Sequence, residues 1–215
     1  MVSRTASKLE AAAAENPGTL PVAADVTNPA SLTAALTTIE QKLGEIHTVV
    51  YNAGLGVWAT YEKVTHEKLE MSMKTNVHGL LTVAQHVGPK MTMRGEGVIA
   101  VTGATAALRG KPITVKITIF YYERTLKFNP KVGFATAKAA QRMLTQSLAR
   151  DLGPKGIHCF YSIIDGRIGA QSGDEGENGS RLDPDGIAEN YWYVAQQKRN
   201  NWTQELDCRP WVENW

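Results

Sequence analysis

Residues 46–54 read IHTVVYNAG, and this stretch decides how the chain is organised. A short apolar run that ends in Asn, Ala and Gly is typical of a buried strand followed by a turn. Similar apolar runs predict further strands at residues 20–26, 97–102, 157–164 and 205–208, and residues 1–4 look like the end of another. The chain therefore supplies the strands of one sheet.

Helical patterns separate these strands. Thr65 is placed to cap a long helix through Met93, and a second long helix is predicted over residues 134–152. Shorter helices are predicted at residues 5–16, at residues 29–43 and from residue 184. Strands that alternate with helices form a parallel sheet with right-handed crossovers, so the predicted fold class is α/β. Ligands of such sheets bind beyond the carboxyl ends of the strands.

Composition excludes several other classes of protein. The chain has 215 residues, of which 43% are hydrophobic and 20% charged, with a net charge of +2. This is long enough for a single domain with a buried core, over residues 1–215, and it is not the composition of a disordered chain. The charge balance argues against a nucleic-acid partner, and no apolar run reaches the roughly 18 residues of a membrane helix.

The cysteine and histidine content bears on the cellular compartment and on metal binding. Two cysteines are too few for a disulfide framework, which favours a reducing compartment and hence the cytoplasm. The five histidines show no ligand spacing, so we predict no metal site.

Four motifs occur in an order that identifies a family: Asp25-Val26, Asn52-Ala53-Gly54, Asn76 within the long helix, and Lys138. Each is weak alone, because Asn-Ala-Gly is usually only a turn. Together they resemble the short-chain dehydrogenase/reductase family over nearly all of the chain, apart from the segment after Pro112. The resemblance implies a three-layer, Rossmann-like, doubly wound parallel sheet, and an oxidoreductase that transfers a hydride between a nicotinamide cofactor and a small carbonyl or alcohol.

The resemblance also implies cofactor-binding residues. Asp25 and Val26 would meet the adenine ring, and Asn52, Ala53 and Gly54 would line the cofactor. Lys138 would hold the nicotinamide ribose, and Asn76 would anchor a water chain in the catalytic set.

Two further positions bear on the cofactor. Arg4 lies where relatives that prefer NADP hold the 2′-phosphate, and Arg suits a phosphate because its guanidinium binds in a bidentate manner. NADP is therefore the expected cofactor, with NAD as the alternative if Arg4 is only a solvated surface residue. Ile168 would offer its backbone to the carboxamide, unless this segment is a plain strand exit.

The chain departs from the family at its start. The family's first strand, Gly-rich turn and first helix would precede Met1, so we expect an incomplete domain that lacks this strand–helix unit. A sheet without that strand exposes unpaired edges and apolar surface, and we expect poor stability of the isolated chain.

The second departure is chemical. The family's Tyr-x-x-x-Lys pattern aligns with Phe134 and Lys138, and the position of its Ser falls on Ala104. Thr102 and Thr105 flank that position but are displaced from it. Phenylalanine cannot exchange a proton, and proton transfer is typically worth about 10²–10⁴-fold in rate, so ordinary carbonyl reduction should be impaired. The segments 102–110 and 182–207 resemble an atypical branch that has Phe at this position, in which Phe134 is a lineage feature.

The third departure is an insertion at residues 113–131. Its alternating Ile, Val, Thr and Lys residues predict a strand pattern, and a hairpin over the site could lend the hydroxyl of Tyr121 or Tyr122. Its abrupt change of composition favours the other interpretation, a translated non-coding segment.

Three functional hypotheses follow. The first is an atypical NAD(P)-dependent oxidoreductase with a small-molecule substrate, which forms a homodimer or homotetramer when intact. The second is a non-catalytic dinucleotide-binding or subunit-interaction protein that uses its two long helices for association. The third is a non-functional fragment.

Overall fold

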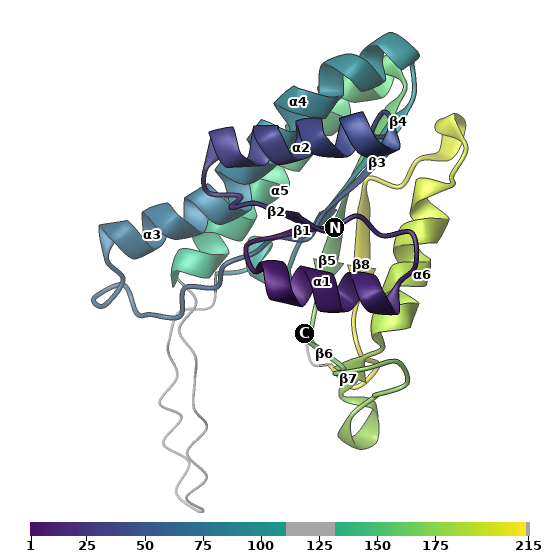
Figure 1. The fold of residues 1–215 in the computed structure, drawn as a ribbon. Helices are drawn as coiled ribbons and strands as arrows, with labels where there is room; N and C mark the ends of the chain where they lie inside the picture. Colours follow the sequence, from purple (N-terminus) through teal and green to yellow (C-terminus); the bar gives the residue numbers. More distant parts are fainter. Residues whose placement is uncertain (111–131, 214–215) are drawn as a thin grey trace, which may run out of the picture.

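A computed structural model describes residues 1–110 and 132–213 (Figure 1). Its strands are β1 (Val2–Ser3), β2 (Val22–Ala23), β3 (Thr48–Tyr51), β4 (Gly97–Thr102), β5 (Ile157–Ile164), β6 (Arg167–Ile168), β7 (Arg181–Leu182) and β8 (Glu205–Cys208). Its α-helices are α1 (Ala6–Glu15), α2 (Pro29–Leu43), α3 (His66–Met73), α4 (Gly79–Arg94), α5 (Val132–Leu152) and α6 (Pro184–Ala195). Short helical turns are η1 (Lys74–His78), η2 (Thr105–Ala107), η3 (Gly153–Lys155), η4 (Glu177–Gly179) and η5 (Arg199–Asn201). The predicted insertion at residues 113–131 lies outside the described residues.

The strands form parallel pairs throughout. The main sheet has the order β3-β4-β5-β8, with Val49 opposite Ile99 and Ile99 opposite Cys159. Two small sheets, β1-β2 and β6-β7, are also parallel. The α/β class with a parallel sheet is therefore confirmed.

The described strands divide among three sheets. β1 pairs only with β2, and β3 pairs only with β4, so one edge of each strand has no partner within residues 1–110 and 132–213. A strand joins a sheet only through such hydrogen-bonded neighbours. Val50 on β3 is a large apolar residue and is 54% exposed.

Two apolar layers enclose the main sheet. On one face, Ile99 and Tyr161 pack with residues of α2, α4 and α5, while Ala100 and Phe160 pack on the other face with Val194 of α6. Figure 1 shows α2, α4 and α5 on one side of the strands and α6 on the other. All eight residues of β5 are buried, as expected for a parallel strand covered on both faces. The three-layer arrangement is thereby confirmed.

The long helix predicted from Thr65 is interrupted. The Thr65 hydroxyl accepts from the Lys68 amide and begins α3, as expected of a cap. The helix then passes through the π-helical turn η1 before it continues as α4. Single π-turns within α-helices occur frequently at functional sites. Asn76 lies in the middle of this turn and is fully buried.

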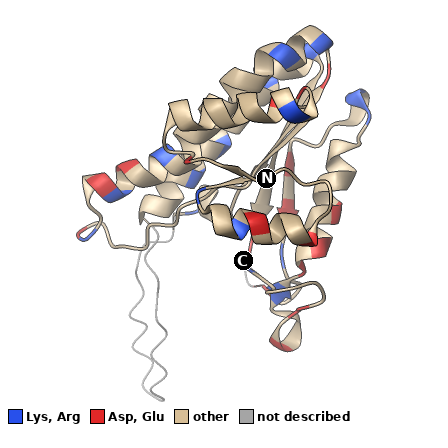
Figure 2. Ribbon diagram, viewed as in Figure 1, with Lys and Arg blue, Asp and Glu red and all other residues tan. Residues whose placement is uncertain are grey.

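Charges of both signs are distributed along the same helices. Figure 2 shows Lys and Asp or Glu side by side on α1 and α3. No helix among the described residues has both the length and the apolarity to span a membrane.

Candidate active site

Lys138 is the central polar group at the carboxyl end of the main sheet. The helix α5 places it there, and only 4% of the residue is exposed. Its Nζ donates to the Thr102 carbonyl at the end of β4 (2.7 Å) and to Oε1 of Gln141 (2.8 Å). Burial lowers the pKa of the Lys138 ammonium to about 8. The group can therefore change its charge near neutral pH.

Asn76 approaches Lys138 from the π-turn η1. Its Nδ2 donates to the carbonyls of Leu55 (3.1 Å) and Ser72 (2.9 Å), which fixes the orientation of the amide. Its Oδ1 is buried and has no hydrogen-bond partner among the described residues. A buried acceptor without a partner is costly unless a ligand or water completes it.

Gly54 lies between these two groups. A Cβ at this position would be 3.5 Å from Oδ1 of Asn76 and 3.7 Å from Nζ of Lys138. The absence of a side chain keeps open a small space that an acceptor and a donor border, and a glycine backbone can be approached closely by a ligand. Three predicted site residues, Gly54, Asn76 and Lys138, therefore come together.

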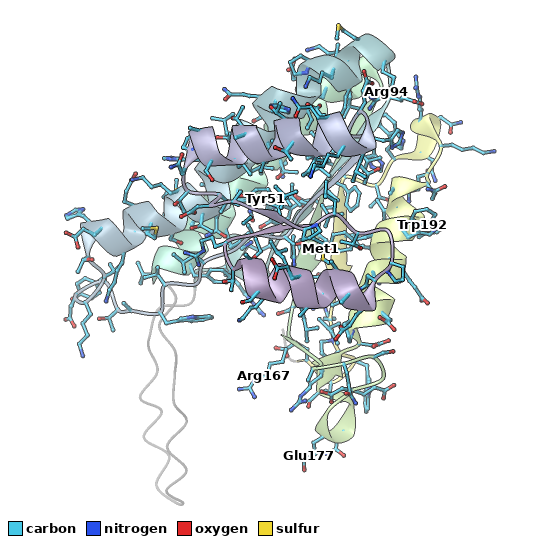
Figure 3. The ribbon with its side chains drawn as sticks, viewed as in Figure 1. Met1, Tyr51, Arg94, Arg167, Glu177 and Trp192 are labelled. Carbon is cyan, nitrogen blue, oxygen red and sulfur yellow. The ribbon has the colours of Figure 1, made fainter. Side chains whose placement is uncertain are left out.

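Asn52 lies elsewhere. It borders a cavity of about 390 Å³ on the α6 face of the sheet, and no hydrogen bond or ion pair among the described residues joins it to Asn76 or Lys138. The same cavity reaches Ile168 on β6, whose side chain is 49% exposed. The cavity is lined by Thr48, Val50, Asn52, Ala100, Thr102, Ile164, Ile168, Pro184, Ile187, Ala188, Tyr191, Trp192 and Ala195. Trp192, labelled on α6 in Figure 3, stands at its outer side.

Phe134 lies one helical turn before Lys138. Nζ of Lys138 is 5.9 Å from the centroid of the Phe134 ring. The indole of Trp58 packs on the same ring, and the two ring centroids are 5.5 Å apart. An ammonium within about 6 Å of an aromatic ring is attracted by its π-electrons. The position that carries a phenol in the family pattern is thus filled by an apolar ring that supports the ammonium without a proton to exchange.

The hydroxyl groups near Ala104 are already engaged. Thr105 donates to Oδ1 of Asp165 at 2.6 Å, and Oγ1 of Thr102 accepts from the phenol of Tyr191 at 2.9 Å. Neither hydroxyl takes the place of the missing Ser at position 104. Sequence reasoning did not single out Asp165 or Tyr191.

Asp165 forms a buried ionic cluster directly after β5. Its Oδ2 lies 3.7 Å from a guanidinium nitrogen of Arg109 and 3.9 Å from one of Arg209. The sequence could have indicated Asp165, because a polar residue directly after a buried strand lies where parallel α/β sheets bind their ligands.

The predicted adenine end lies at the β1–β2 pair. Asp25 follows β2, and its carboxylate accepts from the backbone amide and the hydroxyl of Thr27, both at 2.8 Å. These two hydrogen bonds, with a smaller contribution from the charge of Arg4, hold the pKa of Asp25 below its ordinary value. Val26 packs against the start of α4, where a Cβ on Gly79 would come within 2.8 Å of the Val26 carbonyl. Ala53 packs at the edge of the main core.

The fold and this site define a Rossmann-like α/β protein with a cluster of buried polar groups at the carboxyl end of its parallel sheet. Residues 2–180 match the family model described as enoyl-(acyl carrier protein) reductase. This protein belongs to the short-chain dehydrogenase/reductase family of oxidoreductases, as the resemblance implied.

Individual relatives agree with this assignment. An uncharacterised oxidoreductase of Staphylococcus saprophyticus is 27% identical over 188 residues, which are 86% of this chain and 73% of the relative. The chain spans only about half the length of the next curated relatives it matches.

Solved structures share the fold. A short-chain dehydrogenase from Rhodopseudomonas palustris is 25% identical, with a TM-score of 0.75 over 98% of this chain and 85% of that one. An alcohol dehydrogenase from the archaeon Thermococcus sibiricus, complexed with 5-hydroxy-NADP, is 20% identical. Its TM-score is 0.77 over 99% of this chain and 86% of that one.

Proposed function

We propose that the protein is an atypical NAD(P)-dependent oxidoreductase that acts on a small carbonyl or alcohol. The observation that carries this proposal is the convergence of Gly54, Oδ1 of Asn76 and Nζ of Lys138 around one open space. A donor and an unpartnered acceptor that both lie beside a glycine suit a ribose, whose hydroxyls both donate and accept.

The chain's residues fit the nicotinamide end of such a cofactor. Lys138 would hold the ribose hydroxyls, and the backbone of Gly54 would let the sugar approach closely. Arg4 and Asp25 would bind at the adenosine end, with Val26 against the adenine and Asn52 and Ala53 lining the cofactor. Ile168 would offer its backbone to the carboxamide across the cavity. The nicotinamide, when bound, supplies or accepts the hydride.

NADP is the cofactor we propose, and NAD remains the alternative. Arg4 is exposed near the carboxylate of Asp25, where its guanidinium would suit a 2′-phosphate. The likeness to an alcohol dehydrogenase complexed with 5-hydroxy-NADP adds support for this choice.

Proton transfer must take a route that avoids Phe134 and Ala104. Lys138 is placed to exchange a proton with a water over Gly54, and this water would pass the proton to the substrate oxygen during reduction and take it back during oxidation. Oδ1 of Asn76 would accept a hydrogen bond from the same water and hold it in place. A general acid works best with a pKa near the operating pH, and the lowered pKa of Lys138, about 8, meets that condition.

The test follows NADPH oxidation by the full chain with a panel of small aldehydes and ketones. We expect slow, substrate-dependent turnover that Lys138→Met abolishes and that Lys42→Met, a change of an exposed lysine on α2, leaves intact. Tight NADPH binding without turnover on any panel member would contradict the enzymatic proposal.

A second function is favoured by the apolar packing of Phe134 on Trp58 and by the engaged hydroxyls of Thr102 and Thr105. These contacts suit a non-catalytic dinucleotide-binding protein that associates through its long helices into a homodimer or homotetramer. NADPH binding without turnover, unaltered by Phe134→Tyr, would select this function, and light scattering would give the assembly state. A cytoplasmic location remains a prediction from the cysteine count.

A further inference from the structure

Gln141 joins the two polar residues of the site. It is fully buried on α5, one turn after Lys138. Its Oε1 accepts from Nζ of Lys138 at 2.8 Å, and its Nε2 donates to the backbone carbonyl of Asn76 at 2.8 Å. Residues three apart on a helix lie on one face, which explains how one amide reaches both partners.

Both the oxygen and the nitrogen of the Gln141 side-chain amide form hydrogen bonds with residues of the site. Burying an amide is unfavourable unless its donor and acceptor are hydrogen-bonded, and Gln141 meets that requirement through Lys138 and Asn76. The carbonyl that it binds belongs to the π-turn η1. The bridge therefore ties α5 to the only π-helical turn in the described part of the chain.

The amide also limits how Lys138 can act. An ammonium has three N–H donors, and the Thr102 carbonyl and Gln141 take two of them. An amide is neither an acid nor a base near neutral pH, so it passes no proton from Lys138 to the Asn76 carbonyl. Proton exchange is confined to the third donor.

We propose that Gln141 is a positioning residue, whose amide locks the Lys138 ammonium against the Asn76 turn and thereby directs its remaining donor to the space over Gly54. This inference rests on the proposed cofactor-binding role of Lys138. In this role Gln141 acts through Lys138 and makes no contact with the proposed substrate.

The surroundings of Lys138 make Gln141 its chief side-chain support. No carboxylate within the described ranges lies within 4.0 Å of Nζ, and burial alone lowers the pKa. On β5, the phenol of Tyr161 donates to the Lys138 carbonyl at 3.2 Å.

The other charged groups nearby are directed elsewhere. Lys74 of η1 pairs with Glu70, His78 is exposed, and Arg142 on α5 pairs with Glu205. The side-chain acceptor at position 141 should therefore control the proton affinity of Lys138.

The test is an NMR titration of the lysine ammonium groups in the full chain. Gln141→Glu places a carboxylate against the ammonium and should raise the pKa of Lys138 by about one unit or more. Gln141→Met keeps a similar length but removes the acceptor, and it should lower the same pKa. Gln146→Met is the matched control, because Gln146 lies on the same helix but donates to Glu205. It should leave the Lys138 pKa unchanged.

Opposite shifts in the two Gln141 variants would support the positioning role, and a structural role alone does not produce them. An unchanged pKa in Gln141→Glu, or shifts in the same direction in both variants, would overturn it. If Gln141→Met does not fold, Gln141→Glu decides the question alone. A separate NADPH titration of the wild type distinguishes the two proposals, since failure to bind NADPH sinks the proposed function while the pKa shifts still decide on Gln141.

Discussion

Nζ of Lys138 faces the ring of Phe134 at 5.9 Å, so the ammonium of the site has an aromatic ring beside it where the family resemblance leads one to expect a phenol. The ring is held by Trp58 and the ammonium by Thr102 and Gln141. Binding and proton transfer are therefore separable in this protein, because the residue proposed to hold the ribose is present and the usual proton donor is not.

Phe134→Tyr should restore a proton donor beside Lys138. We expect NADPH-dependent reduction of an accepted carbonyl to rise by about 10–100-fold, because positioned proton transfer contributes at least that much. The dissociation constant of NADPH should stay within about a factor of two, since the hydroxyl is added beside an intact binding group. Steady-state kinetics and a binding titration check both values. A Phe134→Leu control should show no gain, and an equal gain in both variants would contradict the explanation.

The buried ammonium should make stability depend on pH. The pKa of Lys138 is about 8 in the folded chain and 10.5 in its ordinary state, so between these values the unfolded chain binds more protons. Stability therefore rises with pH in this window, by up to about 3 kcal/mol. Cys159 opposes the rise above about pH 9, and Tyr51 and Tyr161 oppose it above pH 10, because burial raises the pKa of the thiol and of both phenols.

Urea unfolding at several pH values from 7 to 10 measures this effect. The rise should be present in the wild type and absent in Lys138→Met, and a rise of equal size in the variant would assign it to another group.

Two glycines of α4 offer a matched test of packing. A Cβ on Gly79 would meet the Tyr51 hydroxyl at 2.3 Å and the Val26 carbonyl at 2.8 Å, whereas a Cβ on Gly88 would have only Leu152 near it, at 3.9 Å. Gly79→Ala should destabilise the chain by about 1–3 kcal/mol through overpacking. Gly88→Ala should change the stability by less than about 1 kcal/mol, because helix propensity favours Ala while the ring of the following Pro89 disfavours a Cβ at this position.

Thermal or urea unfolding measures how each of the two substitutions changes the free energy of unfolding. Equal effects of both changes would mean that α4 does not pack on Tyr51, labelled in Figure 3, as described.

Much of the fold could be predicted because it follows from local patterns. The bounds of β4, β5 and β8 agree with the predicted strands, and for β4 and β5 the reason is that continuous buried runs have clear ends. The cap at Thr65 was also evident from residue type.

Other features depend on contacts that no local pattern records. β2 and β3 are shorter than predicted, because their ends lie beyond the residues that pair with a neighbouring strand. The π-turn η1 changes the hydrogen-bond register within a helix whose apolar spacing continues through it.

Within the site, Gly54, Asn76 and Lys138 lie together, whereas Asn52 borders the apolar cavity on the α6 face. Which residues of two different helices face each other depends on how the helices pack, and no local pattern records that packing. Helical spacing could have indicated Gln141, because it lies three residues after Lys138 on α5.

The dissociation constant of NADPH, measured by titration of the full chain, tests the central claim most directly. Lys138→Met removes a charged donor and should weaken binding by about 10–100-fold, while Lys42→Met should bind as the wild type does. Equal binding by the wild type and Lys138→Met, or no binding by the wild type, would contradict the claim that Gly54, Asn76 and Lys138 form the cofactor site.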